Sequence, residues 1–446
     1  MFAGHESDDD VGMGSRMQSE GWDSHTHVSD FGLYSNDVSP FLPYTNEATS
    51  DPQFPRHTST PSSELLSGQQ VENPFASPRF SKPALSAAQY ACACSVTIDG
   101  ESAIYVIGGL RQGSDSDSWR CRILKYVCVK RWLVGPTEVS LPQDKLLPPL
   151  YQHTAVTVGE KIYIIGKGAT SEGEMYCFDP RYNNVDLVEV ELACEDDSIP
   201  PNFLCHTSVV LLERGTGYPC IVTFGGRASR RALDTLFQYN TVTNVWRRVA
   251  APQTKPRGRV YHAACAVGDR YMYVFGGAPD AKTTTKSDPV FNDLWEYDFW
   301  TNNWTQKRCA GPSPSPRGSC SLIFQEPFMY LYGGFDGNRD LDDFYRYDVH
   351  CETWSKIDPP KETSAGSWAY ASCMLHDTFY YFGGFAQRAD ESIPLSQLRL
   401  ADGVQSYRPE PVSLKQITAR FTARHGLLDG HQGETRTSER NVSSTL

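Results

Sequence analysis

The 446-residue sequence has no apolar run close to the ~20 residues that a membrane-spanning helix needs. Its first residues are polar and acidic, without the apolar stretch of a secretory signal peptide. Cys-x-x-Cys spacings are also missing, although there are 13 cysteines. Scattered cysteines without metal-ligand spacing indicate reduced thiols rather than disulfides or a zinc site. We therefore expect a cytoplasmic protein, with the nucleus as a second location.

Signatures of catalysis are missing too. The sequence has no glycine-rich phosphate loop, nucleophile elbow or paired-carboxylate motif. The net charge is −12, of which residues 1–84 carry −8, residues 413–446 carry +2 and the part between them −6. Such an acidic chain is a poor ligand for nucleic-acid phosphates. We expect no enzyme activity, no cofactor, no metal, and neither a nucleic acid nor a membrane as partner.

What the sequence does contain is a unit that recurs six times. Each copy has a run of four mainly apolar residues followed by a glycine, and in five copies a second glycine follows directly. The first glycines are 50 to 59 residues apart, at Gly108, Gly166, Gly225, Gly276, Gly333 and Gly383. A unit of this length cannot bury both of its faces alone and needs copies on either side.

The second half of the unit is an aromatic residue seven positions before a tryptophan. Three repeats show it directly, as Tyr239 with Trp246, Tyr297 with Trp304, and Tyr347 with Trp354. In the second repeat the same spacing joins Phe178 to Val185, and in the sixth it joins Leu400 to Tyr407. The first repeat is off by one residue, with Tyr126 and Trp132. We expect Trp304 and its counterparts to pack between neighbouring sheets.

These motifs resemble the kelch repeat. The resemblance covers residues 85–411 and implies an all-β fold, a six-bladed kelch β-propeller with four strands in each blade. The residues agree, because the runs are short, rich in β-branched and aromatic side chains, and without helical periodicity. We expect a disordered acidic Ser/Pro-rich tail at 1–84, the propeller at 85–412, and a C-terminal tail at 413–446 with a closing strand or short helix.

The ends of the chain leave two questions open. Ser-Pro and Thr-Pro dipeptides at Ser39, Thr60 and Ser77 fit either phosphorylation sites or an unmodified leader. A strand from Phe80–Ser86 or from Val412–Ala419 is expected to seal the ring, since an open blade would expose a strand edge.

Three histidines, His153, His206 and His262, occupy the same position in consecutive repeats. They could bind a metal in the central channel, or hydrogen-bond locally at the start of the innermost strand. Equivalent positions on successive blades lie too far apart for three bonds of about 2.1 Å to one zinc ion, which favours hydrogen bonding. A copper site like that of galactose oxidase, a related propeller, is the least favoured possibility, because no loop gathers the required His and Tyr ligands.

The resemblance implies that partners dock where the loops before the innermost strands meet the loops after the glycines. Residues there that we expect to contact a partner are Arg111, Arg227, Arg257, Arg259, Arg317, Ser319, Asp336, Asn338, Ser367, Trp368 and Arg388. Arginines with serines suit a carboxylate or an acidic peptide turn, because a guanidinium group binds a carboxylate bidentately. For Arg257 and Arg317 a structural role is equally open, whereas for Arg227 and Arg259 partner contact is favoured.

We therefore expect a non-catalytic module that binds a partner protein or peptide and acts as an adaptor or scaffold. Two alternatives stay open, a substrate receptor of a cullin-type ubiquitin ligase and a scaffold that binds actin or another cytoskeletal partner. The segment Ser413-Leu414-Lys-Gln-Ile-Thr418 begins like the elongin-binding box of kelch ligase receptors. It lacks the cysteine of that box, and no cullin box follows.

Overall fold

The computed structural model describes residues 88, 90–109, 121–130, 132–166, 174–192, 204–228, 231–250, 252–279, 290–358, 370–384 and 404–409. All of them belong to one compact unit, Val38–Leu446. Within these ranges no helix is both long and apolar enough to cross a bilayer. The two expected tails and both expected closing segments lie outside the described residues, so the domain boundaries stay a prediction.

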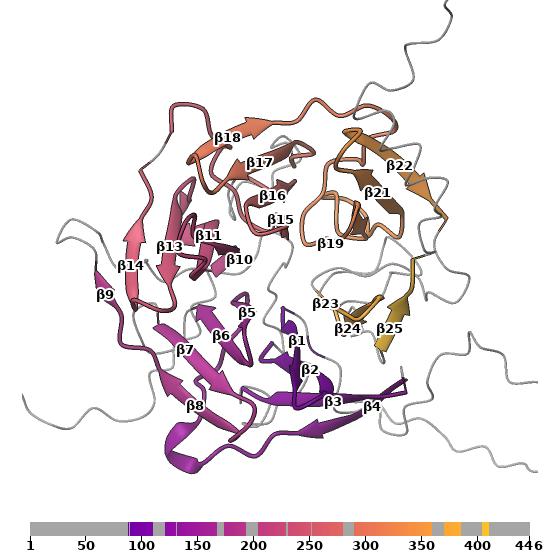
Figure 1. The fold of residues 1–446 in the computed structure, drawn as a ribbon. Coiled ribbons are helices and arrows are strands. Elements are labelled where there is room, and N and C mark those ends of the chain that lie inside the picture. The colour runs from indigo at the N-terminus through magenta and orange to yellow at the C-terminus, as the bar shows by residue number, and fades with distance from the viewer. Residues whose placement is uncertain are drawn as a thin grey trace, which may run out of the picture. The chain divides into compact units, whose positions relative to one another are not determined.

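The described residues form six β-sheets, or blades, in which each main strand pairs antiparallel with the next (Figure 1). Blade 1 consists of β1 (Cys92–Ile98), β2 (Glu101–Ile107), β3 (Ile123–Val129) and β4 (Trp132–Glu138). Blade 2 consists of β5 (Thr154–Val158), β6 (Lys161–Gly166), β7 (Glu174–Asp179) and β8 (Asn184–Leu187). Blade 3 consists of β10 (Leu204–Leu212), β11 (Pro219–Ala228), β13 (Leu236–Asn240) and β14 (Val245–Arg248).

The second half of the ring repeats this arrangement. Blade 4 consists of β15 (Ala263–Val267), β16 (Tyr271–Phe275), β17 (Leu294–Asp298) and β18 (Asn303–Gln306). Blade 5 consists of β19 (Ser321–Gln325), β20 (Phe328–Tyr332), β21 (Phe344–Asp348) and β22 (Thr353–Ile357). Blade 6 consists of β23 (Ala371–Leu375), β24 (Thr378–Phe382) and β25 (Val404–Tyr407). Three short elements complete the set, β9 (Glu191–Leu192) parallel to β14, β12 (Arg231–Ala232) beside β11, and the 3-10 turn η3 (Gln143–Lys145).

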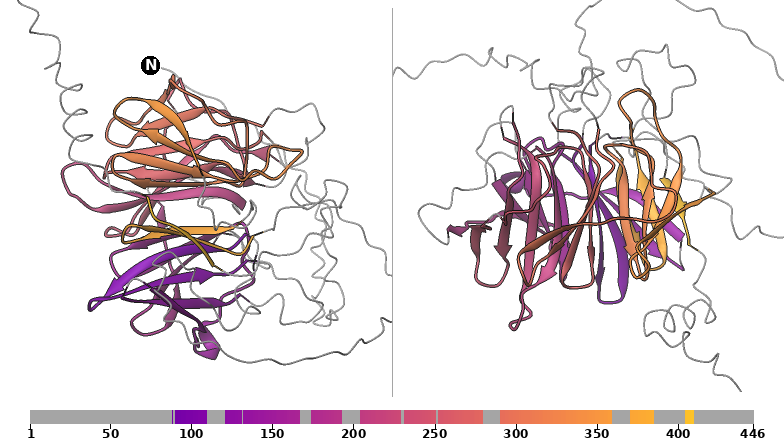
Figure 2. Two further views of the ribbon diagram at one scale, coloured as in Figure 1. Left: turned by 90° about the vertical axis from the view of Figure 1, so that its right-hand side faces the viewer. Right: turned by 90° about the horizontal axis from the view of Figure 1, so that it is seen from above.

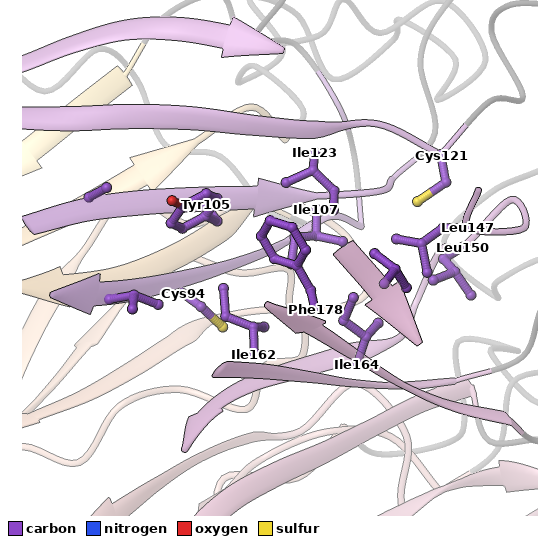
Figure 3. Packing of buried hydrophobic residues seen from close by; sticks show 13 residues of the cluster. Cys94, Tyr105, Ile107, Cys121, Ile123, Leu147, Leu150, Ile162, Ile164 and Phe178 are labelled. Atoms are coloured by element: carbon purple, nitrogen blue, oxygen red, sulfur yellow. The ribbon is translucent and has the colours of Figure 1, made fainter. Parts of the chain in front are cut away.

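A buried apolar cluster lies at each of the six junctions between consecutive blades. Between blades 1 and 2, the rings of Tyr105 and Phe178 meet edge to face with centroids 5.4 Å apart (Figure 3). Between blades 6 and 1, the rings of Phe382 and Tyr126 lie 4.9 Å apart. Because the last blade packs on the first, the ring is closed, and the six-bladed propeller is confirmed.

The glycine pairs are explained by the close approach of neighbouring blades. A Cβ atom on Gly276 would lie 2.4 Å from the carbonyl oxygen of Arg317, and both glycines of the pair have positive φ. The second glycine donates its N–H to the next blade, as from Gly277 to the Arg317 carbonyl at 2.9 Å. The bond from Gly384 to the carbonyl of Ala88, also 2.9 Å, links blade 6 to blade 1.

The tryptophans lie in the core as expected. Trp304 is buried against Tyr297 of its own blade, with ring centroids 5.0 Å apart. It also reaches Phe224 of blade 3 at 4.8 Å. Trp246 and Trp354 are buried at the matching places in blades 3 and 5.

Two expectations about the spacing were wrong. In blade 1, Trp132 is 47% exposed, and the next residue, Leu133, is the buried one at 4%. Leu133 follows Tyr126 by seven positions, but it pairs with Cys128, because the register of the two strands shifts between Lys125 and Val127.

The second error concerns blade 6. Tyr407 pairs with Phe379 on the neighbouring strand, as Tyr239 pairs with Ile221 in blade 3. Tyr407 is therefore the third-strand aromatic of its blade and does not occupy the tryptophan position. Leu400 lies outside the described residues.

The strand order gives the ring two different faces. Because neighbouring strands are antiparallel, the turn between the first and second strands of a blade and the turn between its third and fourth strands lie at one end, which we call the hairpin face. The connections after the glycine pairs and the lead-in loops before the innermost strands lie at the other end, which we call the loop face. Figure 2 shows the blades from two sides, with their strands running between these ends.

Candidate functional site

At the loop face, five residues close around the ring axis. One comes from each of blades 1 to 5, in the order Tyr90, Gln152, Cys205, Tyr261 and Ser319. From Gln152 on, the backbone N–H of each residue donates to the backbone carbonyl oxygen of the one before it, at 2.8 to 3.3 Å. All five have φ between 52° and 61°, which is uncommon for residues other than glycine. We call these residues the collar. Such backbone strain persists only where the surroundings impose it, and it is often found at functional sites.

Four of the collar side chains contact one another. The rings of Tyr90 and Tyr261, from blades 1 and 4, meet with centroids 6.3 Å apart. The Gln152 amide donates to the Tyr261 hydroxyl at 3.0 Å, and the Cys205 thiol donates to the Gln152 amide oxygen at 3.1 Å. Phe335 packs into the same cluster. The loop face therefore has a floor of packed aromatic and polar side chains.

Ser319 is the collar residue whose side-chain hydroxyl is not hydrogen-bonded to any described residue. Its Oγ is buried, and no hydrogen-bond partner for it exists among the residues that the structure describes. The residue as a whole is partly exposed. Buried polar atoms are normally hydrogen-bonded, so an unpaired hydroxyl in a strained collar marks a place where a ligand group could bind.

Two arginines of the site hold the lead-in loops together. The side chain of Arg259 is 0% exposed and binds both carboxylate oxygens of Asp293, at 2.8 and 3.0 Å. It also donates to the carbonyl oxygen of Gly276 at 2.9 Å. Arg317 repeats this in blade 5, with 0% exposure and bidentate bonding to Asp343. Both guanidinium groups therefore bind a carboxylate and a backbone carbonyl of their own blade.

This arrangement corrects the roles expected from the sequence. Arg259, for which partner contact was favoured, is enclosed and occupies the position equivalent to Arg317, not to Ser319. A fully buried, bidentately paired guanidinium cannot reach a partner at the surface, so both residues position the loops instead. Nε of Arg259 donates to the carbonyl oxygen of Arg257 at 3.1 Å, while the Arg257 side chain is exposed. The buried arginine thus fixes the backbone from which the exposed one projects.

Arg227 lies beside the collar. It follows the glycine pair of blade 3 and is almost fully buried. Burial raises the pKa of the Cys205 thiol to about 11, and the nearby Arg227 guanidinium opposes this rise. A positive charge therefore lies next to the floor of the loop face.

The loop after the glycine pair of blade 5 contributes Asp336 and Asn338. The Asp336 carboxylate accepts the N–H groups of Asn338 and Arg339, both at 2.8 Å, so it fixes the turn. Asn338 itself is exposed. Four expected contact residues, Arg111, Ser367, Trp368 and Arg388, lie outside the described residues, and the structure does not place them.

The histidines have a structural explanation. A Cβ on Gly108 would lie 2.8 Å from the His153 ring, and one on Gly225 would lie 2.7 Å from the His262 ring. The rings of His153 and His262 thus pack on the first glycine of the preceding blade. Burial lowers the pKa of His153 to about 4 and that of His206 to about 3. These histidines are neutral spacers between blades.

Neighbouring hydroxyl groups hold two of the rings in place. His206 Nε2 hydrogen-bonds Thr154 Oγ1 at 2.9 Å, and His262 Nε2 hydrogen-bonds Thr207 Oγ1 at 2.7 Å. In the described part of the chain, no three His, Cys, Asp or Glu side chains gather closely enough to bind a metal ion.

The collar itself was missed by sequence reasoning. Tyr90, Gln152, Cys205, Tyr261 and Ser319 share a repeat position but no residue type, and only the backbone conformation unites them. The sole available signal was their constant place directly before the histidine position, which would have pointed to Gln152, Cys205 and Tyr261.

Comparison with known proteins gives one family match. The model of the KLHDC2/KLHL20/DRC7 Kelch-repeats domain matches residues 152–384, just over half of the chain. The matched range includes four of the five collar residues and both buried arginines.

Curated relatives share the repeats at low identity. Kelch domain-containing protein 3 of Rattus norvegicus is 23% identical over 304 residues, 65% of this chain and 76% of that protein. The Leucine-zipper-like transcriptional regulator 1 homolog of Drosophila melanogaster is 27% identical over 162 residues, 36% of this chain and 16% of the relative. Host cell factor 2 of Homo sapiens is 26% identical over 269 residues, 55% and 31% of the two chains. The chain thus spans less than a third of the last two relatives.

Proposed function

The chain belongs to the kelch-repeat family, and we propose that it is a non-catalytic interaction module that binds a peptide segment of a partner protein on its loop face. The observation that carries this proposal is the collar, a strained and packed floor with the Ser319 hydroxyl buried and unpaired among the described residues. A packed floor of this kind offers a surface on which an extended segment can lie.

The charges near the floor favour an acidic group in that segment. Arg257 projects from a backbone that Arg259 fixes, and within the described ranges its side chain makes no ion pair. Arg227 adds a positive charge beside Cys205. A carboxylate from a partner can accept a bidentate bond from an arginine and a further bond from Ser319. A free C-terminal carboxylate and an acidic side chain offer the same chemistry.

The absence of an enzymatic role is supported by the state of the titratable groups. The buried histidines have pKa values held far below neutral by burial, and burial raises the pKa of the Cys94 thiol to about 12. General bases and nucleophiles need pKa values close to the working pH. These groups are instead packed between blades.

Among biological roles we propose an adaptor, because the loop face can bind a segment while the rest of the ring stays available for a second contact. A substrate receptor of a cullin-type ligase and a cytoskeletal scaffold are different uses of the same face. The identity of the captured partner would separate them.

The test uses the full chain and an immobilised random peptide library, prepared once with free C-terminal carboxylates and once as C-terminal amides. We expect the chain to retain peptides with an acidic group, and the double variant Arg257→Ala with Ser319→Gly to bind them at least tenfold more weakly. Glycine suits the positive φ at 319, so the fold is preserved.

The matched control is Arg214→Ala, which removes an exposed arginine on the hairpin face. It should leave binding unchanged, and all three proteins should melt at similar temperatures. Unchanged capture by the double variant, or no preference for acidic peptides, would contradict the proposal. Loss with the amide library alone would identify the C-terminal carboxylate as the group bound.

A further inference from the structure

A cysteine and a histidine meet on the hairpin face where blade 6 adjoins blade 1. Cys128 lies near the end of β3, and His376 lies in the turn between β23 and β24. The Sγ atom of Cys128 is 4.0 Å from Nδ1 of the His376 imidazole, a distance that a weak thiol hydrogen bond can span. Cys128 is partly exposed and His376 is exposed, so solvent reaches the pair.

A chain of hydroxyl groups holds the other ring nitrogen of His376. Its Nε2 lies 3.3 Å from Ser102 Oγ, near the start of β2, and Ser102 Oγ lies 2.8 Å from Thr97 Oγ1, near the end of β1. When Nε2 carries the hydrogen and donates to Ser102 Oγ, Nδ1 is free to accept the thiol proton of Cys128. A nucleophile, a base and a group that orients the base are the parts of an activated thiol.

Five other cysteines in the described residues are partly buried, and their thiols are in a different setting. Burial raises the pKa of the Cys177 and Cys309 thiols, and it raises that of Cys320 to about 11. Burial also raises the pKa of the Cys92 and Cys373 thiols. Such thiols stay protonated near neutral pH and react slowly, because the thiolate is the nucleophile.

We propose that Cys128 is a modification site, at which a small-molecule disulfide of the glutathione type forms a mixed disulfide with the protein. Nδ1 of His376 accepts the proton from Sγ, and the thiolate attacks one sulfur of the small disulfide. The bond between the two small-molecule sulfurs breaks as the bond to Sγ forms. The departing thiolate takes the proton from the imidazolium, so one thiol leaves and no further reactant is consumed.

The modified residue lies at the junction that closes the ring. Cys128 packs against the apolar cluster between blades 6 and 1, which includes Leu375 and Tyr380. A group attached to Sγ therefore adds volume at the edge of this junction. The loop face lies at the opposite end of the strands, so the inference does not depend on the proposed peptide binding.

The test exposes the full chain to glutathione disulfide near neutral pH and follows each cysteine by mass spectrometry of its peptide. The internal reference is Cys351, an exposed cysteine in the turn between β21 and β22. The neighbouring His350 imidazole hydrogen-bonds Glu326 at 3.0 Å. Exposure alone would make Cys351 react faster than Cys128. The contact with His376 reverses this order, and we expect Cys128 to react roughly tenfold faster than Cys351.

The variant His376→Asn removes the base and keeps the turn, because asparagine tolerates the positive φ of 56° at this position. Cys128 should react roughly tenfold more slowly in this variant, while Cys351 keeps its rate. Cys373, which packs at the same junction, should react slowly in both proteins and thereby report that the blades stay together.

Two outcomes would overturn the proposal. One is a wild-type protein in which Cys351 reacts as fast as Cys128 or faster. The other is an unchanged rate of Cys128 in His376→Asn while Cys373 stays slow. If Cys373 becomes reactive in the variant, the blades have separated, and the order of Cys128 and Cys351 in the wild type decides alone.

Discussion

At the scale of single residues, the buried arginines show how a loop face can be both strained and fixed. Arg259 and Arg317 each tie a lead-in loop to a glycine carbonyl and to an aspartate of the same blade. The pKa of Asp293 and that of Asp343 are lowered: burial acts to raise them, but the arginine contacts outweigh it. The charges of Arg259 and Arg317 are thus paired inside the protein. Arg259 also fixes the backbone from which the exposed Arg257 side chain projects.

This assignment predicts opposite results for two neighbouring arginines. Arg259→Ala removes a fully buried side chain and leaves the half-buried Asp293 without its partner, so the free energy of unfolding should fall by about 3 kcal/mol. Arg257→Ala removes an exposed side chain and should change it by less than about 0.5 kcal/mol. Urea unfolding of both variants measures the difference, and equal stability would contradict the structural role of Arg259.

The buried histidines predict a pH dependence in a defined window. Folding lowers the pKa of His153 to about 4 and that of His206 to about 3, from 6.5 in the unfolded chain. Below pH 6.5 the unfolded state binds more protons, so stability is complete above that pH and falls as the pH drops. At pH 5 each histidine should cost roughly 2 kcal/mol.

Thermal unfolding between pH 7 and pH 5 checks this dependence. The control His153→Asn should be less stable at pH 7 but should lose less on acidification, because one proton-binding group is gone. A melting temperature that stays constant over this range would mean that the histidines are accessible and protonated in the folded state.

At the scale of elements, the blade is a four-stranded sheet whose outer hairpin buries one large side chain. Sequence reasoning located this hairpin through the tryptophans and was correct for Trp246, Trp304 and Trp354. It failed in blade 1, where Trp132 was expected to be the buried residue because it is a tryptophan, although Leu133 is the residue seven positions after Tyr126. It failed in blade 6 because Tyr407 was taken for the second residue of the pair, and only the strand pairing shows that it lies on the third strand, opposite Phe379.

Trp304 offers the sharpest test of this packing. Trp304→Ala removes contacts to Phe224 and Tyr297 at a junction of two blades and should cost about 3–5 kcal/mol. Trp300→Ala, four residues earlier in the same hairpin, removes a 39% exposed ring and should cost much less. Similar losses of unfolding free energy in both variants, measured by urea unfolding, would contradict the role of Trp304 in the core between the two blades.

At the scale of the whole molecule, the ring unites loops from five blades that are far apart in the sequence. Repeat spacing was enough to predict six blades, their order and the face on which the lead-in and glycine loops meet. It could not predict the collar, because five different residue types adopt one backbone conformation there. Nor could it distinguish an exposed from a buried arginine, since Arg257 and Arg259 are two residues apart and differ only in what surrounds them.

The central claim is that partners bind on the loop face. The most direct measurement is hydrogen exchange of the full chain with and without an acidic peptide selected from the library. We expect slower exchange in the lead-in loops and collar, around Arg257–Tyr261 and Arg317–Ser319, with no change in the β17–β18 turn at Asp298–Asn303. Protection confined to the hairpin face would contradict it.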